Sequence, residues 1–152
     1  EQDSGKRILR PGVEETGHNR TINRMKWDEN ELRETLADSE TAQSRVFHAY
    51  VRMLRRRANH RAFHPDGAQR LLELGPAIFG LIRHAPDRSE SIVCIYSFSR
   101  EEQVVKNPLD TEWARKVKSF YDILSGKTYG SGRVGVKLTP YQALWLIPRM
   151  QD

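Results

Sequence analysis

The chain has 152 residues and a mass of 17.6 kDa, which is enough for one ordinary domain but too little for two of full size. Hydrophobic residues make up 38% of it and charged residues 30%, a composition that excludes collagen-like, disulfide-scaffold and wholly disordered proteins. No run approaches the roughly 18 apolar residues that a membrane span needs. We therefore expect a soluble protein with a buried core and no membrane partner.

The formal net charge is +5, and it is spread along the chain. Residues 1–66 carry 13 basic and 11 acidic side chains, and residues 67–152 carry 12 and 9. Because nucleic-acid-binding domains usually gather their charge on one face, we do not expect a nucleic-acid partner. Cys94, the only cysteine, lies in an apolar run and is predicted to be buried in a reducing, cytoplasmic protein. The chain begins with Glu1, and we favour the interpretation that it is a piece of a longer protein.

The first 66 residues predict a loop followed by helices. Residues 1–27 are polar, lack a sustained period and predict an extended loop. Asp28 is a candidate N-cap for a short helix. From about Thr41 to Asn59 apolar residues recur every three or four positions, which predicts a helix of about five turns with a wide apolar stripe.

After the turn signal Pro65-Asp66-Gly67, the pattern changes to short apolar runs separated by Gly, Pro and Asn. These runs are Arg70 to Leu74, Ile78 to Ile82, Ile92 to Phe98, Gln103 to Val105, Val117 to Ile123, Val134 to Leu138 and Gln142 to Ile147. Their spacing predicts an antiparallel β-sandwich over residues 67–152. Trp113 to Lys118 is left open as a possible helix, and Tyr129 to Gly132 is interpreted as a turn between runs.

Six arginines and no acidic residue occur in the seventeen residues from Arg45 to Arg61. They would form a phosphate-binding face, or else a face that is solvated or makes ion pairs with a part of the protein outside this chain. The second interpretation is favoured, because aromatic residues at a stacking spacing are lacking.

The usual signs of catalysis and metal binding are weak. His60 and His64 are four residues apart but have no third ligand in register, so we expect neither a metal site nor a cofactor. Gly130-Ser131-Gly132 lacks the lysine and the following helix of a phosphate loop, and it predicts a hairpin turn. Adjacent carboxylate pairs point apart, and no nucleophile is evident. These residues therefore predict no catalytic group in this chain.

Four segments, in order, resemble the sucrose phosphorylase group of glycoside hydrolase family 13. They are E-T-G-H-N-R-T-I-N-R at residues 15–24, A-F-H-P-D-G-A-Q at 62–69, Y-D-I-L-S-G at 121–126 and L-T-P-Y-Q-A-L-W-L at 138–146. The first is similar to that group's T-G-x-x-R-D-I-N-R loop. The resemblance implies an α+β chain in which residues 1–66 are the terminal loop and last helix of a truncated (β/α)8 barrel, followed by the sandwich at 67–152.

The resemblance also implies a function and one substrate contact. The complete enzyme would transfer glucose, with retention, from sucrose or a related α-glucoside to phosphate, using carboxylates on barrel strands that this chain lacks. Arg20 matches the family arginine that reaches the glucosyl subsite, where a guanidinium can bind two hydroxyls or a phosphate at once. Asn23 and Arg24 would hold the loop. Thr21 departs from the family aspartate, which leaves the α-glucoside donor undetermined.

Two alternatives remain open: a segment of an α-amylase-family hydrolase, and a non-catalytic β-sandwich module that binds sugar or nucleic acid. Trp113 and Tyr129 could stack on a sugar, whereas Trp145 lies in an alternating run and is predicted to be core. In the favoured interpretation the chain is inactive alone and its partner is the missing barrel. The helical apolar stripe is then too wide for the sandwich to cover, so we expect the isolated chain to expose an apolar patch, to self-associate, or to fray over its first sixty residues.

Overall fold

The computed structural model of the protein describes residue 17 and residues 27–105, 116–130 and 135–150. By its contacts the chain divides into residues 1–49 and residues 50–152. The boundary predicted after Asp66 was placed where a barrel would end; that boundary, and the origin of the helix in a barrel, stay predictions. The loop predicted over residues 1–27 lies outside the described residues, except for Gly17 and Trp27.

Two helices precede the strands. Helix α2 (Glu29–Ala37) begins where predicted, because the Asp28 side chain accepts hydrogen bonds from the amides of Asn30 and Glu31. Helix α3 (Ala42–Ala58) directly follows Thr41, whose Oγ1 accepts a hydrogen bond from the Ser44 amide at 3.1 Å. The long helix predicted for this region is therefore confirmed, to within a residue at each end.

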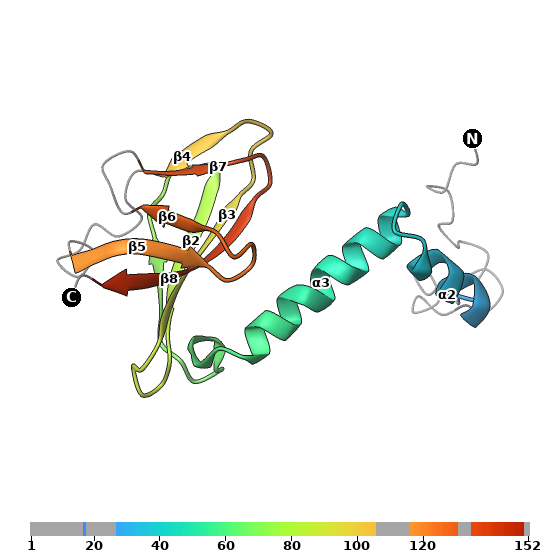
Figure 1. The fold of residues 1–152 in the computed structure, drawn as a ribbon, viewed down its shortest axis with the longest axis horizontal. Helices are drawn as coiled ribbons and strands as arrows, with labels where there is room; N and C mark the ends of the chain where they lie inside the picture. Colours follow the sequence, from blue (N-terminus) through green and yellow to red (C-terminus); the bar gives the residue numbers. More distant parts are fainter. Residues whose placement is uncertain (1–16, 18–26, 106–115, 131–134, 151–152) are drawn as a thin grey trace. The chain divides into compact units, whose positions relative to one another are not determined.

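The described residues after α3 form a short 3₁₀ turn and antiparallel strands (Figure 1). The turn is η2 (Arg61–Phe63). The first sheet has the order β1 (Gln69–Leu72), β2 (Ile78–His84), β3 (Ser91–Ser97), β8 (Ala143–Met150), β5 (Val117–Asp122) and β6 (Thr128–Gly130). The second sheet pairs β4 (Gln103–Val105) with β7 (Val136–Leu138). The predicted antiparallel β domain is confirmed, and most predicted runs coincide with strands.

Each face of the larger sheet has its own hydrophobic cluster, because successive side chains of a strand point to opposite faces. One cluster includes Ile82, Val93 and Leu144, and the side chains of β4 and β7 complete it. The other contains Ile92, Cys94 and Trp145 together with Ala62 and Phe63 of η2. Central strand β3 contributes to both clusters, which explains its nearly continuous apolar sequence.

One predicted turn is wrong, and one open segment is resolved in part. Tyr129 and Gly130 were assigned to a turn, but they belong to β6, where Tyr129 is opposite Phe120 of β5. Ser131 and Gly132 lie outside the described residues. In the segment left open as a helix, Val117 and Lys118 are in strand β5, while 113–115 are not described.

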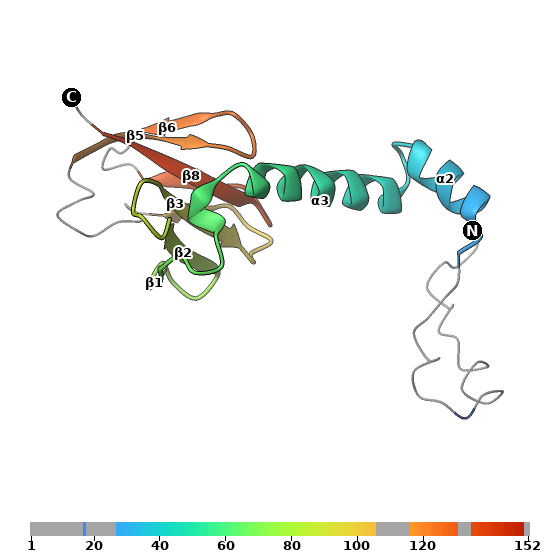
Figure 2. The same ribbon diagram turned by 90° about the horizontal axis from the view of Figure 1, so that it is seen from below.

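The chain passes from α3 to the sheet through η2 and a tight turn (Figure 2). The amide of Gly67 donates to the His64 carbonyl, and a Cβ at Gly67 would collide with the backbone oxygen of His84. A side chain at this position would push η2 away from the end of β2. Gly67 therefore fixes where the residues after α3 meet the sheet.

Candidate functional site

The residues predicted to contact or shape a substrate site, Arg20, Asn23 and Arg24, lie outside the described residues. Their roles stay predictions. In the part of the chain that the structure describes, no three His, Cys, Asp or Glu side chains are grouped so that they could hold a metal ion. Likewise, no helix among the described residues is long and apolar enough to cross a membrane.

A polar arrangement built on Glu90 lies where η2 meets the sheet. One carboxylate oxygen of Glu90 lies 2.6 Å from His60 Nδ1, and the other accepts the Ala62 amide at 3.0 Å. Glu90 is 28 and 30 residues away from these partners. The carboxylate therefore joins the end of the α3 segment to the start of β3.

Arg83 of β2 holds the same turn from the sheet side. Its Nε donates to the Ala62 carbonyl and its Nη2 donates to the His64 carbonyl, both at 3.0 Å, while Nη1 donates to Gln69 Oε1. Two backbone carbonyls of a turn are satisfied by one guanidinium, whose planar fork suits this geometry. Sequence analysis missed both Arg83 and Glu90, and the only signal nearby was the A-F-H-P-D-G-A-Q resemblance.

Aromatic side chains of η2 and of strand β8 pack together at this junction. The Phe63 ring lies 4.6 Å from the Trp145 ring, and the Trp145 indole N–H donates to Tyr96 Oη at 2.8 Å. Trp145 is 5% exposed, so the prediction that it belongs to the core is confirmed. The indole is buried with its donor satisfied and shows no open face for a sugar.

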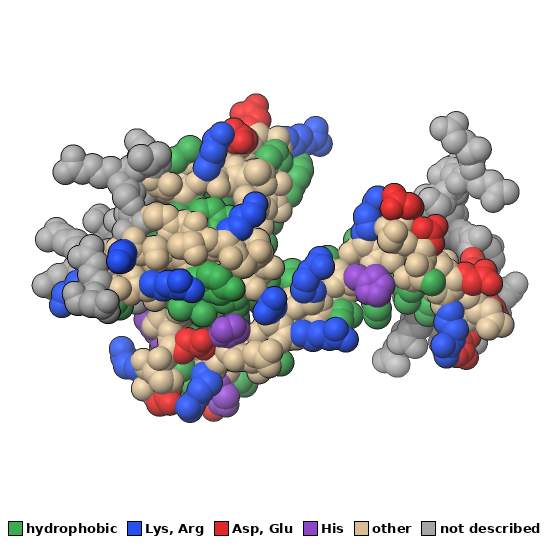
Figure 3. Space-filling view, in the orientation of Figure 1, with side chains coloured by type: hydrophobic (Ala, Val, Ile, Leu, Met, Phe, Trp, Pro, Cys, Tyr) green, Lys and Arg blue, Asp and Glu red, His purple; other side chains and the backbone are tan. Residues whose placement is uncertain are grey.

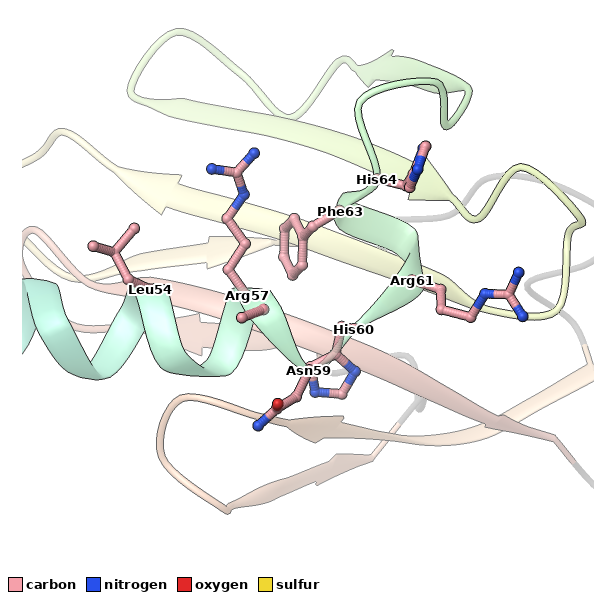
Figure 4. Close-up of a pocket in the computed structure, with 8 residues that line it drawn as sticks. Leu54, Arg57, Asn59, His60, Arg61, Phe63 and His64 are labelled. Atoms are coloured by element: carbon pink, nitrogen blue, oxygen red, sulfur yellow. The ribbon is translucent and has the colours of Figure 1, made fainter.

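A hollow of about 510 Å³ opens beside this junction (Figure 4). It is lined by Leu54, Arg57, Ala58, Asn59, His60, Arg61, Phe63 and His64. Its apolar surface comes from Leu54, Ala58 and Phe63, while its polar rim carries two arginines and two histidines. No carboxylate is among the lining residues, so the hollow suits an anionic or carboxylate-bearing group.

Of the arginines of α3, Arg57 lines the hollow. Figure 3 shows Lys and Arg side chains spread along the helices and over the strands. Within the described residues, Arg45, Arg52, Arg55, Arg56 and Arg57 have no ion-pair partner, whereas Arg61 pairs with Asp87 at 2.9 Å. Cations in the last turn of a helix also stabilise its negative end. This accounts for part of the charge without a ligand.

The apolar stripe of α3 is largely uncovered. Val46 is 69% exposed, Tyr50 62% and Leu54 43%, and the helix buries only Ser44 fully. Met53 packs against the sheet cluster that contains Phe63. The prediction that the chain presents an exposed apolar patch is confirmed.

Other titratable groups serve the fold. Burial raises the pKa of the Cys94 thiol to about 12, against smaller opposing effects of Arg83 and a hydrogen bond from Tyr96, so the predicted burial of this cysteine is confirmed. Burial, followed by repulsion from Arg88 and Arg70, lowers the pKa of His84, whose Nδ1 lies 2.8 Å from Ser91 Oγ. No described carboxylate orients this histidine, so the chain of groups that activates a serine nucleophile is absent there.

Comparison with known proteins shows similarity over nearly the whole chain. The glucosylglycerate phosphorylase of Spirochaeta thermophila is 37% identical over 150 residues, which are 95% of this chain and 26% of the relative. The enzyme of the same name from Allomeiothermus silvanus is 31% identical over 140 residues, covering 90% and 21%. That of Escherichia coli is 28% identical over 135 residues, covering 89% and 22%. No protein-family model matches the chain.

The chain is a relative of the sucrose phosphorylase-like enzymes of glycoside hydrolase family 13. The resemblance found in the four sequence segments is therefore confirmed. The chain spans about a quarter of the length of these family 13 relatives, and it corresponds to their C-terminal part.

A solved family 13 structure supports the fold. The chain aligns with AmyP, crystallised in complex with maltotriose, at a TM-score of 0.52 and 19% identity, over 66% of this chain and 19% of that one. At this identity the likeness concerns the arrangement of the strands alone. The antiparallel β domain is thus like the C-terminal domain of family 13 enzymes.

Proposed function

We propose that the chain is the C-terminal segment of a glucoside phosphorylase that transfers a glucosyl group from an α-glucoside to phosphate with retention. The observation that carries the proposal is the 37% identity to a glucosylglycerate phosphorylase over 95% of this chain. Retention requires a nucleophilic carboxylate and a second carboxylate that acts as acid and then as base. We assign both to the remainder of the enzyme, so the segment is inactive alone.

The substrate contact that we assign to this segment is Arg20. The loop at residues 15–24 would place its guanidinium at the glucosyl subsite, where it could donate two hydrogen bonds to sugar hydroxyls or to the incoming phosphate. Asn23 and Arg24 would hold the loop in position. Because relatives at 28% to 37% identity are named for glucosylglycerate, that donor is tested before sucrose.

The partner of the segment would be the barrel of the same enzyme. The stripe of α3 supports this assignment, because an apolar helix face of this width is normally buried against other secondary structure. The β domain would then cap the barrel from outside. A buried, unpaired thiol at Cys94 and the use of inorganic phosphate both fit a cytoplasmic enzyme.

A chimera tests the assignment directly. Residues 1–152 replace the matching quarter of the Spirochaeta thermophila enzyme, and glucose 1-phosphate is measured after adding glucosylglycerate and phosphate. Phosphate-dependent release is expected. A folded chimera that hydrolyses the donor without phosphate would move the assignment to an α-amylase-type hydrolase, and a folded but inactive one would contradict it.

Two arginine variants of the chimera test the substrate contact. Arg20→Met is expected to lower kcat/KM about 100-fold, since loss of charge-assisted hydrogen bonds costs about 2–3 kcal/mol. Arg10→Met removes the same charge outside the loop signature, and we expect it to leave kcat/KM within about two-fold. Equal effects of the two substitutions would remove Arg20 from the site.

A further inference from the structure

The hollow at the end of α3 is apolar inside and cationic at its rim. Leu54 and Ala58 lie one turn apart on the helix, and the buried ring of Phe63 lies opposite them. Tyr50 continues the apolar surface one turn before Leu54. The surface is therefore suited to an apolar side chain lying against Leu54 and Phe63, with a charged group next to the arginines of the rim.

The charge of the rim is only partly neutralised by the chain itself. His60 faces Glu90, and Arg61 pairs with Asp87. Arg57 has no partner among the described residues, whereas His64 Nδ1 accepts a hydrogen bond from the Asp66 amide at 3.2 Å. The oxygens of Glu90 are engaged by His60 and the Ala62 amide, and among the described residues Glu90 makes no ion pair with Arg57. Arg57 is exposed and can therefore pair with a carboxylate of a partner.

The η2 side of the hollow is held in place before anything binds. Arg83 fixes the carbonyls of Ala62 and His64, and Glu90 fixes His60. The Phe63 ring packs against the Trp145 ring at an interplanar angle of 48°. This side of the hollow therefore loses little conformational entropy on binding, which favours affinity for a complementary partner.

We propose that the hollow lined by Leu54, Arg57 and Phe63 is a docking site for an acidic, apolar segment of the remainder of the enzyme. In this segment an apolar side chain would fill the surface between Leu54 and Phe63, and a neighbouring Asp or Glu would pair with Arg57. This inference depends on the proposed function only in assigning the docking segment to the remainder of the enzyme. The positive charge of Arg57 favours an acidic residue in the segment, and the apolar lining favours a protein segment over a free small anion.

A pair of peptides tests the site on the chain as it is. The first probe is a fluorescein-labelled nonapeptide with a central leucine flanked by two glutamates, and the second has glutamine in both positions. Fluorescence anisotropy is expected to give at least ten-fold tighter binding of the acidic peptide, since each charge-assisted hydrogen bond changes affinity by about ten-fold. Raising the salt from 50 to about 500 mM should reduce the difference.

Two matched variants locate the binding. Arg57→Glu is expected to weaken the acidic peptide more than ten-fold, whereas Arg55→Glu makes the same charge change on another side of the helix and is expected to have less than a two-fold effect. Helical content is checked by circular dichroism in both. Equal losses in the two variants, equal binding of the glutamine peptide, or full competition by citrate at the peptide's own concentration would each overturn the proposal. Failure here with an active chimera would leave the proposed function intact.

Discussion

Replacement of the buried carboxylate of Asp122 is expected to destabilise the β domain strongly. Asp122 is 0% exposed and accepts hydrogen bonds from the amides of Leu124, Ser125 and Trp145 and from the Ser125 hydroxyl. These contacts tie the turn after β5 to the central strand β8. Asp122→Ala removes every one of them at once.

The loss of stability depends on which of the hydrogen-bond donors can be solvated by water once the carboxylate is removed. The Ser125 groups are exposed and Leu124 is half-buried, so water can replace much of what they lose. The Trp145 amide is buried and stays unsatisfied, which alone costs about 1–3 kcal/mol. The loss of one or two further charge-assisted hydrogen bonds adds to this cost. The variant also no longer buries a carboxylate, which offsets part of it, so we expect the free energy of unfolding to fall by about 3 kcal/mol.

Urea unfolding followed by tryptophan fluorescence measures this loss. At a typical slope for a domain of this size, about 3 kcal/mol lowers the midpoint by roughly 2 M urea. Ser125→Ala is the control, because it removes one exposed donor and is expected to cost less than about 1 kcal/mol. A shift for Asp122→Ala no larger than that of Ser125→Ala would refute the reasoning that the buried Trp145 amide dominates.

Three further predictions concern other buried or half-buried groups. Arg83→Met should cost about 2–3 kcal/mol in urea unfolding because three hydrogen bonds are lost, whereas Arg149→Met, whose guanidinium lies 4.8 Å from the Tyr121 ring centre, should cost less than about 1 kcal/mol. The pKa of His84 is lowered from 6.5 by folding, so the unfolded chain binds more protons, stability falls as the pH drops through about 6.5, and His84→Gln should flatten this part of the pH profile. Cys94 has its pKa raised to about 12 and is 1% exposed, so mass spectrometry should find it unmodified by iodoacetamide at pH 8 in the native protein and alkylated in urea.

Elements set by neighbouring residues could be predicted from the sequence. The N-cap at Asp28 and the helix from Ala42 to Ala58 depend on side chains within four residues of one another, which is the range that periodicity reads. Strands such as Gln103–Val105 were found because alternation and flanking turn residues mark them locally. The wrong turn at Tyr129 shows the limit, since its strand exists because it pairs with Phe120 of β5.

The junction at η2 could not be predicted, because it depends on residues far apart in the chain. Glu90 contacts a residue 30 positions away, and Arg83 reaches back 21 positions to the Ala62 carbonyl. Neither residue stands out in its own segment: a charged residue in a strand or turn usually faces solvent. The predicted site at Arg20 came from family resemblance, and it stays a prediction that the chimera tests.

The two parts of the chain differ in what stabilises them. In the β domain, both faces of the large sheet are covered by clusters whose members are almost wholly buried, so its strands gain the burial that offsets their loss of entropy. Helix α3 lacks this support, because its one fully buried residue is Ser44 and its apolar stripe faces outward. A helix of 17 residues is only marginally stable in water without an apolar face to pack. A partner that buries Tyr50 and Leu54 would therefore stabilise the helix on binding. A segment bound in the hollow beside Arg57 would contribute to the same stabilisation, because Leu54 lines that hollow.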